Sequence, residues 1–140
     1  MRTARAIVCL FCISLLACGT SETAPQTASI SGTITYAGAA AGHGRPLAIA
    51  VYRAFPPKGP PVAWRLIEQY QLPYRYTFDN LPPGSYVVGA LVDVDPADTR
   101  NIGQLNAARD PHGYSASGRL LPVDATHIAE GADIVLEDAK

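Results

Sequence analysis

Charged residues are scarce in this sequence, and neither sign is in excess. Lys and Arg together number 11 and Asp and Glu 12, so that 16% of the 140 residues are charged and the formal net charge is −1. Without a basic excess, the chain has no electrostatic footprint for nucleic acid. Its hydrophobic content of 48% is also too high for a disordered chain. The low charge therefore excludes a nucleic-acid-binding protein and a charged coiled coil, and the high hydrophobic content excludes a disordered segment.

Long apolar runs are equally scarce, and the one that stands out lies at the N-terminus. Residues 6–17 (AIVCLFCISLLA) are apolar and follow Arg2 and Arg5. As a helix, this run would span about 18 Å, well short of the ~30 Å hydrocarbon core of a membrane. Residues 1–17 are therefore predicted to be a signal peptide that is removed, not a transmembrane helix.

The apolar run ends in Leu15-Leu16-Ala17-Cys18, followed by Gly19. This pattern resembles the bacterial lipoprotein signal, whose lipobox places a Leu three positions before an acylated Cys. The resemblance implies that Cys18 becomes the first residue and anchors the protein through acyl chains, of which two or more hold stably. It also implies that Gly19, in place of an Asp, directs the protein to the outer membrane, facing the periplasm. The alternative is an ordinary secretory peptide with a chance Cys.

Cysteine is absent from the rest of the chain. Cys9 and Cys12 lie in the segment predicted to be removed, and Cys18 is the predicted acylation site. No disulfide is then possible, so the folded part depends on its hydrophobic core alone. Residues 18–28 are small and polar and predict a flexible tether, and residues 29–138 are predicted to form one domain.

Glycine and proline, twelve of each, favour short strands and turns over long helices. Apolar and polar residues alternate in residues 29–36, with Ile30 and Ile34 on one side, as in a half-buried strand. About seven strands at this spacing indicate an all-β, antiparallel β-sandwich. The other strands are predicted at 46–55, 63–72, 74–78, 85–94, 119–123 and 132–137, with a long irregular loop at about 95–118.

A structural corner between two strands is predicted at Leu81, Pro82, Pro83, Gly84 and Tyr86. Pro83 and Gly84 suit the central positions of a type II turn, in which Gly84 would take a positive φ. Leu81 is expected to enter the core. Tyr86 is expected to pack inward while its hydroxyl reaches a backbone group, as in the tyrosine corners of sandwiches.

The corner is part of a longer resemblance. Residues 78–86 match Phe-x-x-Leu-Pro-Pro-Gly-x-Tyr, residues 30–34 resemble a first strand, and residues 132–136 resemble a last strand of the carboxypeptidase regulatory-like family. Of the family pattern that precedes the second strand, this sequence matches only Pro46-Leu47. The resemblance implies a transthyretin-like sandwich with a binding or structural role, not an enzyme. The insertion at 93–118 departs from the family pattern.

Carboxylates gather in one loop, where alternating Asp residues suit the six to eight oxygen ligands of Ca²⁺. Ala97 and Thr99 stand where a calcium loop would have a Gly and a further carboxylate. A solvated or salt-bridged loop, neutralised by nearby arginines, is the alternative. The candidate ligands are Asp93, Asp95, Asp98 and Asp110, and Ca²⁺ is the one cofactor that the sequence suggests.

Motifs for enzymatic chemistry are weak. His43, His112 and His127 lack the spacing of metal ligands. Ser115 follows His112 closely in the sequence, and a hydrolase built on His112 and loop acids is the least favoured alternative. Residues 110–115 are predicted to form a turn in which Gly113 takes a positive φ.

Two further segments suggest binding. Residues 57–60 match the PxxP pattern of polyproline ligands but are predicted to form a stiff hairpin loop. Four aromatic residues could form a sugar-stacking face, although half of them are needed for the core: Trp64, Tyr70, Tyr74 and Tyr76. We therefore predict a non-enzymatic, acyl-anchored module of the cell envelope whose partners are the membrane and envelope proteins or glycans, with a Ca²⁺-stabilised or carbohydrate-binding module as the alternative.

Overall fold

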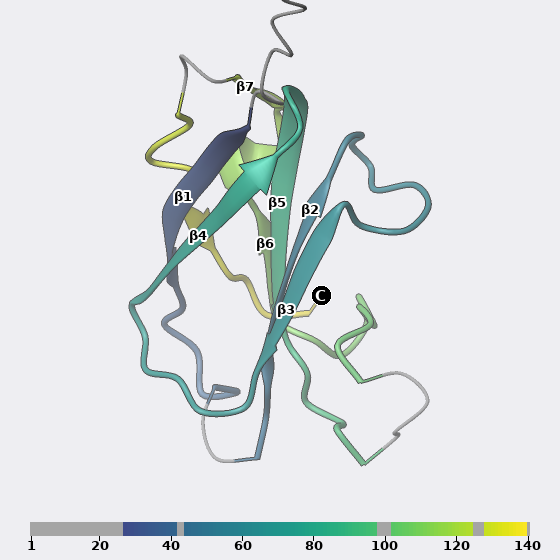
Figure 1. Ribbon diagram of the computed structural model, residues 1–140. Helices are drawn as coiled ribbons and strands as arrows, with labels where there is room; N and C mark the ends of the chain where they lie inside the picture. The colour runs from purple at the N-terminus through teal and green to yellow at the C-terminus, as the bar shows by residue number, and fades with distance from the viewer. Residues whose placement is uncertain (1–26, 42–43, 98–101, 125–127, 140) are drawn as a thin grey trace, which may run out of the picture.

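The chain folds into two facing β-sheets, and the predicted all-β sandwich is confirmed (Figure 1). The computed structural model describes residues 27–41, 44–97, 102–124 and 128–139. The smaller sheet has the order β4 (Tyr74–Leu81), β1 (Ala28–Thr35) and β8 (Ile134–Val135). Strands β1 and β4 are antiparallel, but β1 and β8 run parallel, which the prediction did not include.

The larger sheet is antiparallel throughout. Its main order is β3 (Ala63–Ile67), β2 (Leu47–Tyr52), β5 (Gly84–Val92) and β6 (His112–Tyr114). Strand β7 (Leu121–Val123) pairs with the first residues of β5. The short turn η1 (Ser115–Gly118) lies in the connection between β6 and β7. Within the described ranges, no helix is long and apolar enough to cross a membrane.

The core lies between the two sheets and is built by every second residue of the facing strands. The inward alternation predicted for the first strand is confirmed, and β2 and β5 follow the same alternation, because these positions are fully or almost fully buried. They include Ile30 and Ile34 of β1, Leu47, Ile49 and Val51 of β2, and Tyr86, Val88 and Val92 of β5.

Several strand boundaries differ from the prediction. β3 ends at Ile67 because residues 68–73 leave the larger sheet to reach β4 in the smaller one. Val94 lies beyond the end of β5, and β8 covers only two residues of the predicted 132–137. Ala28, predicted as the end of the tether, is the buried first residue of β1.

Strand β6 was not predicted. It lies in the segment expected to be an irregular loop, and the expected turn at 110–115 is wrong because His112 and Tyr114 pair with β5. Gly113 has no positive φ, but a Cβ atom on it would lie 2.2 Å from the carbonyl oxygen of Val135. A glycine is needed here because β6 passes very close to β8.

The predicted corner is confirmed in its contacts and wrong in its turn type. Leu81 is buried, and the Tyr86 hydroxyl donates a hydrogen bond of 2.5 Å to the carbonyl oxygen of Pro82. Gly84 begins β5 without a positive φ, whereas Asn80 has a φ of 60°. Asn tolerates this left-handed conformation better than most residues. The positive φ therefore lies inside β4, where the register with β1 shifts, and not at Gly84.

Candidate functional site

The outer face of the larger sheet is hollow because its central residues are small. Ala50 of β2 pairs with Gly89 of β5 at the middle of the sheet. Trp64 of β3 pairs with Ala50 on one side, and Tyr114 of β6 pairs with Gly89 on the other. Across the four strands the side chains therefore run large, small, small, large, which forms a groove with aromatic walls.

This groove has a volume of about 650 Å³, within the range of about 300–1,000 Å³ that is typical of ligand sites. One end is formed by Pro57 and Pro61 of the β2–β3 connection, which is a hairpin loop as predicted. The other end is formed by residues 102–105. Figure 1 shows both segments on the side of the larger sheet away from β1 and β4.

Asp93 holds one end of the groove in place through Gly103. Its carboxylate accepts hydrogen bonds from the backbone N–H groups of Gly103 and Asp95, each at 3.0 Å. Gly103 has a φ of +72°, and a Cβ atom on it would lie 3.1 Å from Leu66 and 3.4 Å from Ala48. The glycine therefore lets residues 102–105 lie directly on the sheet.

The predicted calcium ligands brace this loop. Asp110 is 2% exposed, and its two carboxylate oxygens accept hydrogen bonds from backbone N–H groups at 2.7 and 3.2 Å. Asp95 forms an ion pair of 2.9 Å with Arg109, and Asp98 lies outside the described residues. Within the described part of the chain, no three His, Cys, Asp or Glu residues form a group that could hold a metal ion.

The aromatic wall at Tyr114 is supported by a left-handed turn. Phe55 packs edge-on against Tyr114, with ring centroids 5.1 Å apart. Ala116 and Ser117 of η1 have φ values of 47° and 53°, which costs about 1 kcal/mol or more for each residue. Gly118 follows with a φ of +87°, and a Cβ atom on it would lie 2.6 Å from the Phe55 ring. The turn thus brings the backbone against the back of this wall.

Two tyrosine side chains lie at the floor of the groove. A Cβ atom on Gly89 would lie 2.9 Å from the Tyr114 ring and 3.7 Å from the Tyr52 ring, so the Tyr114 ring covers the glycine and the Tyr52 ring lies beside it. Burial raises the pKa of the Tyr52 phenol, and burial together with the neighbouring Tyr52 raises the pKa of Tyr114. Both hydroxyls are therefore protonated at neutral pH and can donate hydrogen bonds.

His112 lines the groove, but its ring and the Ser115 hydroxyl face different backbone groups. His112 Nδ1 lies 2.9 Å from the carbonyl oxygen of Asp110. Ser115 is fully buried, and its Oγ accepts a hydrogen bond of 3.0 Å from the Val88 N–H. The Ser115 hydroxyl is thus used to attach η1 to β5. His43 and His127 lie outside the described residues.

The four aromatic residues predicted as a sugar-stacking face do not form one surface. Trp64 is 63% exposed on the groove, whereas Tyr76 is in the core and donates a hydrogen bond of 2.5 Å to the carbonyl oxygen of Ala132. Tyr70 and Tyr74 pack against the core. The residues that join Trp64 are Tyr52 and Tyr114, which the sequence analysis missed. A glycine at position 89, in the middle of a strand, was the available signal for a close approach of other groups.

Comparison with models of known protein families gave no matching family, and comparison with curated proteins and with solved structures gave no match. The likeness to the carboxypeptidase regulatory-like family therefore depends on the strand and corner motifs alone.

Proposed function

We propose that this protein is a non-enzymatic lipoprotein of the bacterial cell envelope, anchored by acyl chains on Cys18, that binds an envelope component in the groove of its β-sandwich. The observation that supports binding is the groove itself. A concave site lined mostly by apolar and aromatic side chains, with a few polar groups among them, is the usual form of a binding site.

The anchor is supported by the order of residues at the N-terminus. Two arginines, an apolar run and Leu15-Leu16-Ala17-Cys18 follow one another in the order of a lipoprotein signal. The first strand begins at Ala28, so residues 19–27 separate Cys18 from the sandwich. This spacing is sufficient for a tether between the membrane surface and the folded domain.

The position of the tether is compatible with a free groove. The chain enters the sandwich through β1, which belongs to the smaller sheet, whereas the groove lies on the outer face of the larger sheet. A protein held at its N-terminus would therefore present the groove to the periplasm without covering it with the membrane.

The buried polar side chains around the groove are engaged in hydrogen bonds to the backbone, which supports a binding role and not a catalytic one. Asp93 and Asp110 accept hydrogen bonds from backbone N–H groups of the loop. Ser115 Oγ accepts one from β5. These side chains hold the walls of the groove, so the groups that remain for a ligand are aromatic rings and neutral polar groups.

Metabolic labelling with an alkyne-bearing palmitate in a Gram-negative host tests the anchor. We expect the full-length chain to be labelled and to fractionate with the outer membrane. Cys18→Ser should abolish the label, whereas the matched variant Cys12→Ser should keep it, because Cys12 lies in the removed segment. Gly19→Asp should move the labelled protein to the inner membrane. Label that persists in Cys18→Ser would rule out this anchor.

A further inference from the structure

We infer that the groove binds an uncharged oligosaccharide, one of whose sugar rings stacks on Trp64. This inference rests on the proposed role of the groove as a binding site and specifies the chemistry of its ligand. A sugar ring has a face of C–H groups and an edge of hydroxyl groups. It therefore needs flat apolar surfaces with neutral hydrogen-bonding groups beside them.

The apolar surface is present around the hollow floor. Trp64 is 63% exposed, and Phe55, Ile102 and Leu105 are also exposed large apolar side chains at or beside the groove. An indole ring in this position offers a broad flat surface at a small cost in conformational entropy. The floor at Ala50, which is half-buried, leaves space for a ring to lie against it, whereas the Tyr114 ring covers Gly89.

Polar side chains lie beside this surface. Tyr52, Tyr114, Gln104 and His112 line the groove together with Trp64. Phenol hydroxyls, an amide and an imidazole all exchange hydrogen bonds with sugar hydroxyls as donors or acceptors. No hydrogen bond joins the Tyr52, Tyr114 or Gln104 side chain to another of the described residues, so these groups are available to a ligand.

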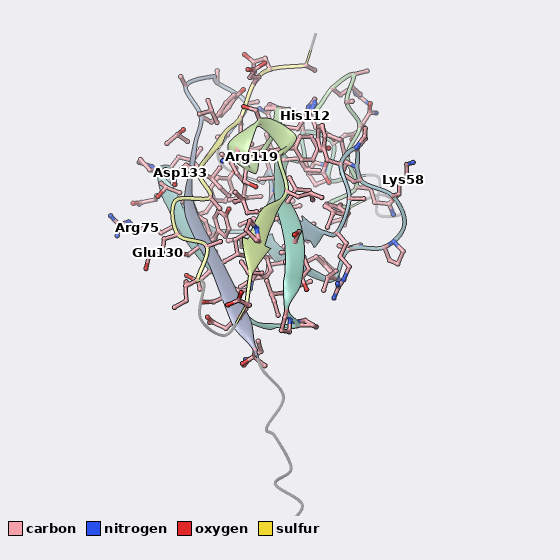
Figure 2. The ribbon with its side chains drawn as sticks, turned by 90° about the horizontal axis from the view of Figure 1, so that it is seen from above. Lys58, Arg75, His112, Arg119, Glu130 and Asp133 are labelled. Carbon is pink, nitrogen blue, oxygen red and sulfur yellow. The ribbon has the colours of Figure 1, made fainter. Side chains whose placement is uncertain are left out.

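The absence of formal charge favours an uncharged ligand. Among the described residues that line the groove, there is no Asp, Glu, Lys or Arg. Lys58 lies in the β2–β3 connection but is not part of the lining, and Figure 2 shows it at the periphery, on the opposite side of the molecule from Arg75 and Glu130. An anionic glycan buried in this groove would find no Lys or Arg to pair with among the described lining residues.

The sheet itself disfavours an extended peptide. Strands β2 and β5, which form the floor, each have a neighbour on both sides, so that their main-chain groups are already paired along the groove. A peptide cannot add to this face as a further strand, the mode that gives extended peptides most of their affinity. A wholly apolar ligand would leave the tyrosine hydroxyls without partners on burial.

Trp64 is the only tryptophan of the chain, so its fluorescence reports directly on the groove. The test uses the full chain in a detergent without a sugar headgroup, titrated with cellotetraose, maltotetraose and N-acetylchitotetraose. Tetragalacturonate serves as an anionic control. We expect at least one neutral saccharide to shift the emission to the blue and to reduce quenching by acrylamide. Its affinity should exceed that of the anionic control by about tenfold or more.

Variants assign this response to the groove. Ala50→Leu fills the floor and should reduce the affinity at least tenfold while the far-UV circular dichroism and the thermal midpoint stay unchanged. Trp64→Ala, followed by calorimetry, should lose affinity to a similar extent, and Trp64→Phe should retain part of it. Val135→Ala, an exposed change on β8, is the matched control and should leave the affinity unchanged.

Three results would overturn the inference. The first is that none of the neutral saccharides changes the Trp64 signal at millimolar concentrations. The second is that binding persists in Ala50→Leu. A photo-crosslinking residue at position 64 that captures an envelope protein in cells would likewise replace the saccharide with a protein ligand. Labelling at Cys18 is a separate readout. A wrong inference about saccharide binding is therefore distinguishable from a wrong proposal about the acyl anchor.

Discussion

The two faces of the larger sheet are made by the same strands and have opposite properties. On the inner face, Leu47, Ile49 and Val51 of β2 are buried against the smaller sheet. On the outer face, the intervening Ala48 and Ala50 leave a groove open. Ala48 is only 7% exposed because Gly103 lies against it, whereas Ala50 is half-buried on the open floor of the groove. An apolar residue left open on a sheet face is unusual, which marks this floor as a contact surface.

The two faces are also held together by different interactions. The inner face is closed by side-chain packing, which supplies most of the stability of a sandwich. The outer groove is bounded by loops attached through polar groups, namely Asp93, Asp110 and Ser115. Stability and ligand recognition are therefore placed on opposite sides of one sheet, and changes on each side should have separable effects.

The largest effect should come from neighbouring residues of β2 that face opposite ways. Ile49→Ala should lower the free energy of unfolding by about 3 kcal/mol because it leaves a cavity in the core. Ala50→Leu should change it by no more than about 0.5 kcal/mol because that side chain faces outward. Urea unfolding followed by circular dichroism measures both, and equal losses would contradict the separation of the two faces.

A smaller loss should follow from removing the support of the outer groove. Asp110→Ala leaves two N–H groups of the loop without their carboxylate partner and should cost about 2 kcal/mol. Asp95→Ala is the matched control, because its ion pair with Arg109 is exposed and should contribute less than about 0.5 kcal/mol.

Thermal unfolding with and without EDTA tests the hypothesis that Ca²⁺ binds in this loop. Because the carboxylate oxygens of Asp93 and Asp110 already accept backbone hydrogen bonds, EDTA should leave the thermal midpoint of the wild-type protein unchanged. A midpoint that falls with EDTA and recovers with Ca²⁺ would show instead that a cation supports the loop.

The stability of the core should also depend on alkaline pH, because Tyr76 of β4 is buried in it. Burial, and then the nearby Asp133, raise the pKa of this phenol above its ordinary value of 10.0. The folded state thus retains a proton that the unfolded state loses, so the contribution of Tyr76 is complete below pH 10 and falls as pH rises through the folded-state pKa. Tyr76→Phe should flatten the decline of unfolding free energy above pH 10, and an unchanged slope would argue against this assignment.

The smallest effect, and a gain, should come from the turn behind the aromatic wall. Ala116 has a φ of 47°, so Ala116→Gly should raise the free energy of unfolding by about 0.5–1 kcal/mol. Asn80→Gly should have a smaller effect, because Asn already tolerates its φ of 60°. If Ala116→Gly destabilised the protein in thermal unfolding, the strain assigned to η1 would be wrong.

Local patterns in the sequence determined the class of fold and the corner. Alternation of apolar residues placed Ile30 and Ile34 in the core, and the likeness to the tyrosine corners of sandwiches predicted that the Tyr86 hydroxyl reaches the backbone. These features depend on residues close to one another in the chain. The order of residues around Cys18 likewise predicts an anchor from a short segment.

Only the tertiary structure decided where the groove lies. β6 has three residues, too few for an alternation to be recognised, and its place is set by pairing with β5 and by the close approach of Gly113 to β8. Trp64, Gly89 and Tyr114 share one row because three strand registers agree. Such a register arises from contacts between distant segments, which local patterns do not encode. The sequence by itself therefore determined a sandwich and a candidate anchor, and the pairing of its strands created the binding surface.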